Sequence, residues 1–131
     1  MSRLAKVMAA AAFVLAGAPI SSSASADNTV PCWVSGDSGY HAVLKHKPRK
    51  CTLGGRSGFQ QVDVVRMRWR SWGGENAVGR GGSVANMGSR AKVRVRLFRP
   101  VRWEQDTWRF TRARFRFDEG DWGPPLVLRI R

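Results

Sequence analysis

Acidic residues, histidines and cysteines are all scarce in this sequence. Its 131 residues include 9 Asp and Glu against 23 Lys and Arg, with only 2 His and 2 Cys. No G-x-S-x-G, H-E-x-x-H or Walker pattern occurs, so the sequence lacks common signatures of hydrolases and of nucleotide-binding enzymes. We therefore expect no enzyme, no cofactor and no metal site. The least favoured reading is a secreted ribonuclease-like enzyme, for which His41, His46 and either Glu75 or Glu104 could be nominated.

The sequence also lacks an apolar run long enough to cross a bilayer, which takes about 20 residues. The uncharged apolar stretch Val7–Gly17 follows Arg3 and Lys6 and leads to Ala24-Ser25-Ala26, a pattern typical of a cleavable signal peptide. We expect residues 1–26 to be a helical signal peptide that is removed after Ala26, and not a membrane anchor. No cysteine stands at the cleavage site to carry a lipid, so the sequence predicts free secretion without stable membrane insertion.

Residues 27–131 are expected to form one basic domain. After removal of Arg3 and Lys6, 21 basic and 9 acidic residues remain, which gives a net charge of +12. Arginine outnumbers lysine 18 to 5, a bias that a GC-rich genome also produces. The net charge itself favours association with polyanions.

Cys32 and Cys51 are the only cysteines, and both lie in the expected mature chain. An even number of cysteines in an oxidising compartment indicates a disulfide, whereas two thiols and two histidines make a poor zinc site. We expect a Cys32–Cys51 bridge that staples the loop between them.

Short apolar stretches divided by Gly, Pro, Ser and Asp predict strands. We expect strands at residues 30–34, 40–44, 62–72, 91–98 and 126–130. Residues 45–50 are expected to form a basic loop, and residues 118–123 an acidic turn. Residues 53–58 and 73–89 are too rich in glycine for an element to be assigned. Pro100 should end the strand at 91–98 or mark a sheet edge.

Residues 103–117 fit two structures. Trp103, Phe110, Ala113 and Phe117 would share one face of a helix, but aromatic and threonine residues favour strands, and residues 112–117 alternate strictly. We favour a strand. Because the apolar residues change parity after Phe110, a continuous strand would need a β-bulge near Thr111.

The expected fold class is all-β. Five to seven strands with glycine-rich turns indicate an antiparallel sandwich or a small barrel.

The segment Arg68-Trp69-Arg70-Ser71-Trp72-Gly73-Gly74 contains a W-x-S-W-G motif. Together with Ala77 and Gly79, the Arg99-Pro100-Val101 step and the aromatic residues near Phe110, it resembles small exported proteins of actinobacterial type that are uncharacterised. The resemblance implies secretion, a β-rich body and a disulfide, and it implies no activity.

Arginines recur at every second position of the predicted strands. Residues i and i+2 of a strand point to the same side about 6.6 Å apart, a spacing that suits successive groups of an anionic polymer. The candidate binding residues are Arg66, Arg68, Arg70, Lys92, Arg94, Arg96, Arg112, Arg114, Arg116 and Trp72, and Arg129 and Arg131 form a further pair. The alternative is a solvated sheet face on which the arginine stems cover apolar area.

Six tryptophans can pack in the core or stack on the rings of a ligand. Trp69 shares the apolar face with Val65 and Met67 and is expected to be buried. Trp72 and Trp122 are the candidates for exposure.

Two function classes remain. The favoured one is a secreted, non-enzymatic binding module for an anionic partner, which could be a cell-wall polymer, an acidic polysaccharide, a nucleic acid or an acidic protein. The alternative is a secreted inhibitor-like or structural scaffold for protein interaction. Arginines gathered on one face would favour the first, and a protruding loop at residues 73–89 would favour the second.

Overall fold

The computed structural model describes residues 28–37, 39–55, 60–84, 90–104 and 106–131, and these contain eight strands and no helix. The strands are β1 (Asn28–Gly36), β2 (Gly39–Lys45), β3 (Cys51–Gly54), β4 (Gln61–Ser71), β5 (Asn76–Val84), β6 (Arg90–Glu104), β7 (Thr107–Phe117) and β8 (Leu126–Val127). The all-β prediction is confirmed. The expected signal peptide and Asp27 lie outside the described residues.

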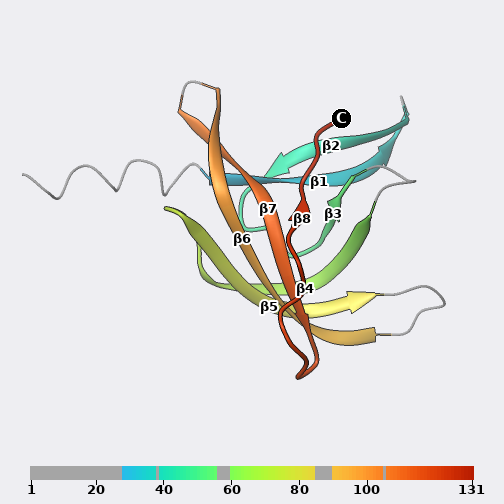
Figure 1. Cartoon of the computed structure of the whole chain (residues 1–131). Coiled ribbons are helices and arrows are strands. Elements are labelled where there is room, and N and C mark those ends of the chain that lie inside the picture. The colour runs from blue at the N-terminus through green and yellow to red at the C-terminus, as the bar shows by residue number, and fades with distance from the viewer. Residues whose placement is uncertain (1–27, 38, 56–59, 85–89, 105) are drawn as a thin grey trace, which may run out of the picture.

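The strands form one sheet in the order β2-β1-β7-β6-β5-β4-β3, with β8 paired to β7 (Figure 1). Most pairs are antiparallel, but β1 runs parallel to β7 where Asn28 and Thr29 meet Trp108 and Arg109. The sheet is therefore mixed, which corrects the expected purely antiparallel arrangement.

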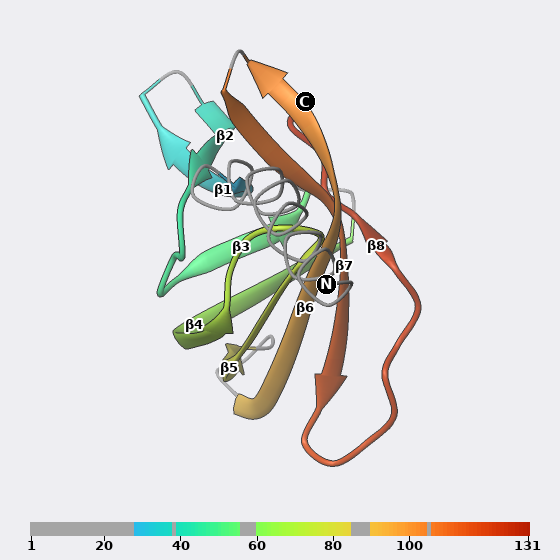
Figure 2. The ribbon, with the colours of Figure 1, turned by 90° about the vertical axis from the view of Figure 1, so that its left-hand side faces the viewer.

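The sheet is strongly curled, so that its far end comes back toward β1 (Figure 2). A disulfide between Cys32 on β1 and Cys51 on β3 joins the two regions, as predicted. The segment after β8 links β3 to β7, the neighbour of β1, because the Leu128 amide donates to the Thr111 carbonyl of β7 at 3.0 Å and the Arg129 amide donates to the Gly54 carbonyl of β3 at 2.7 Å.

The core lies inside this curl. The alternation predicted for β6 is confirmed, because Val93, Val95 and Leu97 are buried while Lys92, Arg94 and Arg96 are exposed. The other strands contribute Val30, Leu53, Val64, Met67, Phe110, Ala113, Phe115 and, beyond β8, Leu128. The outer side of the sheet carries these cations together with a few half-buried apolar residues such as Val78 and Phe98.

The prediction of which β4 residues face the core is wrong in the first half of the strand. Val64, and not Val65, is buried, because the β4/β5 register shifts by one residue between Val65 and Arg68. Arg66 lies in this bulge with a φ of 54°, a left-handed conformation that residues with a side chain rarely adopt. The bulge returns Met67 to the core.

Residues 103–117 form no helix, and the strand prediction is confirmed with a change: Trp103 and Glu104 end β6, and β7 starts at Thr107. The β-bulge expected near Thr111 is absent, since the pairing runs without a shift from Phe98/Arg112 to Pro100/Phe110. The change in which β7 residues face the core is instead accommodated on β6, the facing strand. There Arg99 has a φ of 55°, and its carbonyl accepts a hydrogen bond from the Thr111 hydroxyl at 2.7 Å.

Pro100 does not end β6, which continues to Glu104. The pairing of β5 with β6 stops at Phe98, so Pro100 has a ladder partner only on β7. Proline lacks a backbone donor and is tolerated at such an edge. Of the two expected outcomes, Pro100 therefore marks a sheet edge and does not end the strand.

Two strands were not expected. β3 is only four residues long, and β5 occupies much of the glycine-rich stretch 73–89, to which no element could be assigned from the sequence. β5 needs glycine because Cβ atoms at residues 79 and 81 would stand 2.6 Å from the Trp69 ring and from the Val65 carbonyl oxygen, respectively.

Candidate anion-binding surface

Four arginines form a row across the outer side of the sheet. Arg68 on β4 pairs with Arg80 on β5, Arg80 pairs with Arg94 on β6, and Arg94 pairs with Arg116 on β7. Directly opposite residues of an antiparallel pair point to the same side with Cβ atoms about 5 Å apart. The register therefore brings four like charges from four strands into one line.

A second row lies next to the first. Val78 of β5 pairs with Arg96 of β6, and Arg96 pairs with Arg114 of β7. The Arg96 Nε donates to the Asn76 Oδ1 at 3.1 Å, and the guanidinium carbons of Arg96 and Arg114 lie 5.6 and 5.9 Å from the centre of the Phe98 ring. Phe98 thus holds two of the cations by cation–π contacts.

The remaining predicted cations extend the same surface. Lys92 lies opposite Gly82, and Arg112 lies opposite Phe98. We call the whole set the basic plate. It consists of Arg66, Arg68, Arg70, Arg80, Lys92, Arg94, Arg96, Arg112, Arg114 and Arg116, which lie on strands β4 to β7.

The cations on β7 are less exposed than those on β4 and β6. Arg112, Arg114 and Arg116 are each half-buried. The Arg116 Nε donates to the Gly120 carbonyl at 2.7 Å, and an Arg112 Nη1 donates to the Thr111 carbonyl at 3.0 Å. The Arg114 Nε is buried without a hydrogen-bond partner. These arginines are therefore constrained in position by the fold.

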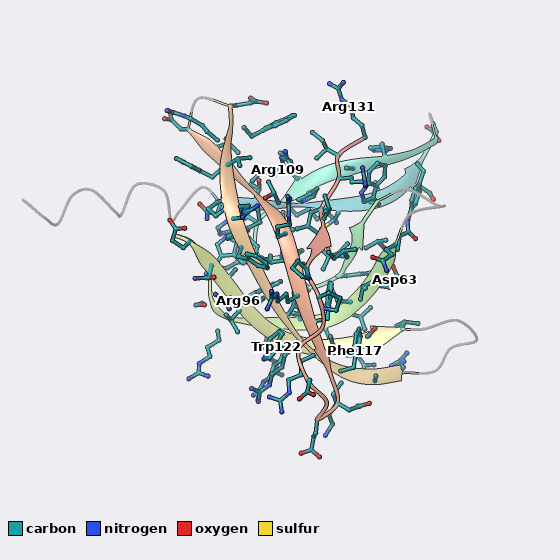
Figure 3. The ribbon with its side chains drawn as sticks, in the orientation of Figure 1. Asp63, Arg96, Arg109, Phe117, Trp122 and Arg131 are labelled. Atoms are coloured by element: carbon teal, nitrogen blue, oxygen red, sulfur yellow. A yellow bond between two sulfur atoms is a disulfide. The ribbon has the colours of Figure 1, made fainter. Side chains whose placement is uncertain are left out.

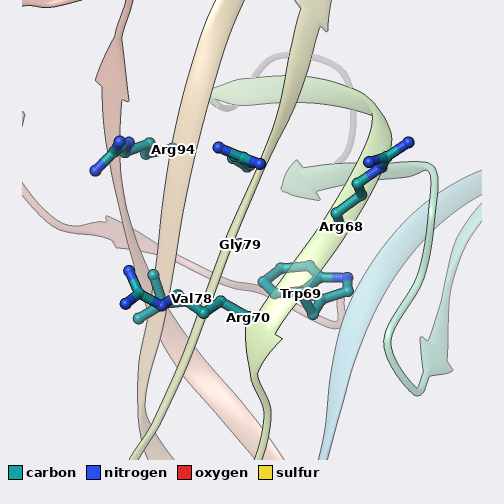
Figure 4. A pocket seen from close by; sticks show the side chains of 7 residues that line it. Arg68, Trp69, Arg70, Val78, Gly79 and Arg94 are labelled. Carbon is teal, nitrogen blue, oxygen red and sulfur yellow. The ribbon is translucent and has the colours of Figure 1, made fainter.

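Two hollows of about 310 and 680 Å³ open on the basic plate and share Arg68, Arg80 and Arg94. The smaller one also involves Arg70 (Figure 4). The larger one extends to Arg66 and Lys92 and ends at the carboxylates of Asp118 and Glu119. The two hollows thus meet at three shared arginines, and among the described residues the smaller hollow has no acidic residue in its lining.

Arg80 was missed by the sequence reasoning. It is flanked by Gly79, Gly81 and Gly82, so the alternation that marks the other strands is hidden. Once these glycines are recognised as positions that lie against β4, it follows that the Arg80 side chain points to the outer side of the sheet. No simple sequence signal would have placed it between Arg68 and Arg94.

Trp72 does not belong to the basic plate, which corrects the expectation that it is exposed beside the arginines. A second register shift, between Trp69 and Ser71, turns its side chain inward. Its Nε1 donates to the Asn28 carbonyl at 2.9 Å, and its ring makes edge contacts with Trp69 and Phe110. Trp72 is half-buried against the core.

The W-x-S-W-G segment accordingly acts as structural support. The Trp69 Nε1 donates to the Pro48 carbonyl at 2.8 Å, and the Ser71 hydroxyl oxygen accepts the Val78 amide at 3.2 Å. Gly73 and Gly74 have φ values of 114° and 63° and make the turn into β5. The motif thereby fixes β4 and β5, which carry Arg68 and Arg80.

The other predicted features lie elsewhere. Arg129 and Arg131 follow β8, and Figure 3 shows Arg131 well apart from Arg96. Trp122 is exposed, as expected, and Trp103 is exposed to the same extent, 40%. The Arg109 guanidinium lies 5.2 Å from the centre of the Trp103 ring, and burial lowers the pKa of Arg109 because desolvation disfavours its charged form.

The histidines are not brought together. His41 lies in β2 and His46 follows its end, so that five residues of extended chain, roughly 16 Å, separate them. The His46 Nδ1 lies 3.2 Å from the Asn28 carbonyl oxygen, and the His41 Nδ1 lies 3.2 Å from the Gly39 carbonyl oxygen. Each ring contacts the backbone, and they form no acid–base pair.

No group of three or more His, Cys, Asp or Glu side chains suited to a metal ion occurs within the described ranges. Those ranges also contain no helix that is long and apolar enough to cross a membrane. Comparison with known proteins found no matching family model, no matching curated protein and no matching solved structure.

Proposed function

We propose that this chain is an exported, non-enzymatic binding module that contacts an anionic polymer through the basic plate. The observation that carries the proposal is the row Arg68, Arg80, Arg94 and Arg116, paired in register across four strands. Like charges directly opposite each other destabilise a sheet. A row of four is costly to the free protein, and a bound polyanion would offset that cost.

The distribution of charge supports this role over a merely solvated face. A solvated face needs polar residues of either sign, whereas the plate gathers ten cations on four adjacent strands. Asp118 and Glu119 line the larger hollow, which is also lined by five of these cations. The net charge of +12 expected for residues 27–131 would add long-range attraction to the local contacts.

Export is part of the proposal. The disulfide between Cys32 and Cys51 is consistent with an oxidising compartment. The signal-peptide pattern of residues 1–26 supplies the route.

The scaffold alternative receives less support. It required residues 73–89 to protrude as a binding loop, but residues 76–84 form β5, which is hydrogen-bonded on both sides inside the sheet. Residues 85–89 lie outside the described ranges.

The test compares two variants that each lose four charges. The plate variant carries Arg68→Gln, Arg80→Gln, Arg94→Gln and Arg116→Gln. The control carries Lys45→Gln, Lys47→Gln, Arg49→Gln and Lys50→Gln, which are exposed residues of or next to the basic loop. Affinity for a single-stranded DNA 40-mer and for dextran sulfate is measured at several salt concentrations.

Cation–phosphate contacts release counterions, so the log affinity for single-stranded DNA should fall with log salt at a slope of about −0.7 per phosphate neutralised. We expect the plate variant to lose more affinity than the control and to have a flatter slope. Equal losses in the two variants would mean that net charge alone attracts the polymer, and the proposal would be wrong.

A further inference from the structure

The smaller hollow on the basic plate is lined by four arginines from three strands. Arg68 and Arg70 come from β4, Arg80 from β5 and Arg94 from β6, and Trp69, Val78 and Gly79 complete the lining (Figure 4). Among the described residues, no Asp, Glu or His lines this hollow. It is therefore a cationic site with no internal counter-charge.

The size of the hollow is sufficient for a compact anion. The volume of about 310 Å³ lies at the lower end of the range for small-molecule sites, roughly 300 to 1,000 Å³. The Trp69 ring lies where a Cβ atom of residue 79 would stand, so it forms part of the wall of the hollow. A compact anion with little attached bulk fits these limits.

The charge of the hollow indicates a dianion. The like charges of the four arginines repel one another, and an anion with two charges offsets more of this repulsion than an anion with one. A carboxylate or a phosphodiester brings a single negative charge. A phosphomonoester brings close to two, together with three oxygens that match the forked geometry of guanidinium groups.

We propose that this hollow is a phosphomonoester site, in which Arg68, Arg70, Arg80 and Arg94 bind a terminal dianionic phosphate group. The inference deepens the proposed function and depends on it, because it assigns the centre of the basic plate to a phosphate at the end of, or attached to, the anionic polymer. Arg80 is the central ligand, since it pairs with both Arg68 and Arg94.

The experiment follows the backbone amide resonances of Val78 and Gly79 while methyl phosphate is added at constant ionic strength and pH 7.5. Saturable shifts of these two amides are expected. Dimethyl phosphate and acetate, which carry one charge, should bind at least tenfold more weakly. Equal responses to all three anions would overturn the site.

The pH supplies a second readout. Phosphomonoesters lose their second charge below a pKa of about 6, whereas sulfate remains a dianion. At pH 5 the affinity for methyl phosphate should fall at least fivefold while the affinity for sulfate is retained. Sulfate also controls for titration of the nearby Asp118 and Glu119, which line the adjoining hollow. Retention of full methyl phosphate affinity at pH 5 would contradict recognition of a dianion.

Variants provide the last arm. Arg80→Gln and, independently, Arg94→Gln should weaken methyl phosphate binding at least tenfold with the dispersed amide spectrum preserved. Arg131→Gln makes the same chemical change at an exposed residue outside the hollow and should have no effect. Equal weakening in Arg131→Gln would overturn the site.

The outcomes separate this inference from the proposed function. Salt-dependent polymer binding that needs the plate arginines, without selective binding of methyl phosphate, would remove the phosphomonoester site and keep the polymer surface. Selective methyl phosphate binding without any polymer binding would keep the site and remove the polymer surface.

Discussion

Gly79 lies directly opposite Trp69, and the indole ring of Trp69 occupies the space that a side chain at residue 79 would need. A Cβ atom there would stand 2.6 Å from the ring Cε3 and 2.9 Å from the Arg68 carbonyl oxygen. The ring cannot readily move away, because its Nε1 donates a hydrogen bond to the Pro48 carbonyl and the ring packs against Trp72. This glycine therefore sets how closely β4 and β5 approach.

Gly79→Ala should lower the free energy of unfolding by about 1 to 3 kcal/mol, because overpacking forces the backbone or the ring to shift. The matched control is Gly82→Ala on the same strand, where the nearest atom would be the Val65 Cγ2 at 3.6 Å. Urea denaturation should show the loss only for residue 79. Equal losses at both positions would contradict the explanation.

Arg66→Gly should separate binding from stability. Glycine adopts the φ of 54° at this bulge without strain, so the free energy of unfolding should stay constant or rise by up to about 1 kcal/mol. Polymer affinity should fall, because a cation of the basic plate is lost. Arg68→Gly, at a residue without a positive φ, should instead lose stability. A decrease in stability as large as that of Arg68→Gly would argue against strain at Arg66.

Reduction of the Cys32–Cys51 bridge should lower the free energy of unfolding by about 3 kcal/mol in the chain-entropy account, given the 19-residue separation. Chemical denaturation with and without a reductant measures this, and the double variant Cys32→Ser, Cys51→Ser should match the reduced protein. A thiol assay on denatured, unreduced protein should read close to zero. Two thiols per chain would show that the bridge does not form.

Trp72→Phe should cost about 0.5 to 1.5 kcal/mol of stability, since it removes the indole hydrogen bond to the Asn28 carbonyl, which keeps its contact with the His46 ring. Polymer affinity measured at a temperature where the variant is folded should remain unchanged. An unchanged stability with a loss of affinity would mean that Trp72 contacts the ligand after all.

Export should yield a mature chain that begins at Asp27. Mass spectrometry of the culture supernatant measures the N-terminus directly. Recovery of the intact chain from the membrane fraction, with Met1 or its neighbours retained, would contradict the signal-peptide prediction.

The sequence was most informative where side chains alternate. The strand at Val93, Val95 and Leu97 could be predicted because each apolar residue is followed by a cation. The disulfide could be predicted from the number of cysteines alone. The alternation depends on consecutive residues, and the disulfide prediction depends on composition. Neither prediction requires knowledge of the partner strand.

The sequence was least informative where two strands share one irregularity. The parity change at Thr111 is absorbed by Arg99 on the facing strand, and Arg80 gains its meaning only from Arg68 and Arg94 beside it. The parallel contact of Asn28 with Trp108 likewise depends on where the curl brings two distant segments. Register between strands is a tertiary property that a single strand does not encode.

The bonds that close the curl also bear on how the chain folds. The Trp33 Nε1 donates to the Arg129 carbonyl across 96 residues, and the Thr29 hydroxyl donates to the Trp108 carbonyl across 79. Such contacts give a high contact order, which is typical of domains that fold in milliseconds to seconds and not in microseconds. The hydrogen bond from Trp33 of β1 cannot form before the residues near 129 are in position. We expect closure of the sheet to be a late event in folding, with the hairpins of β4 to β7 formed before it.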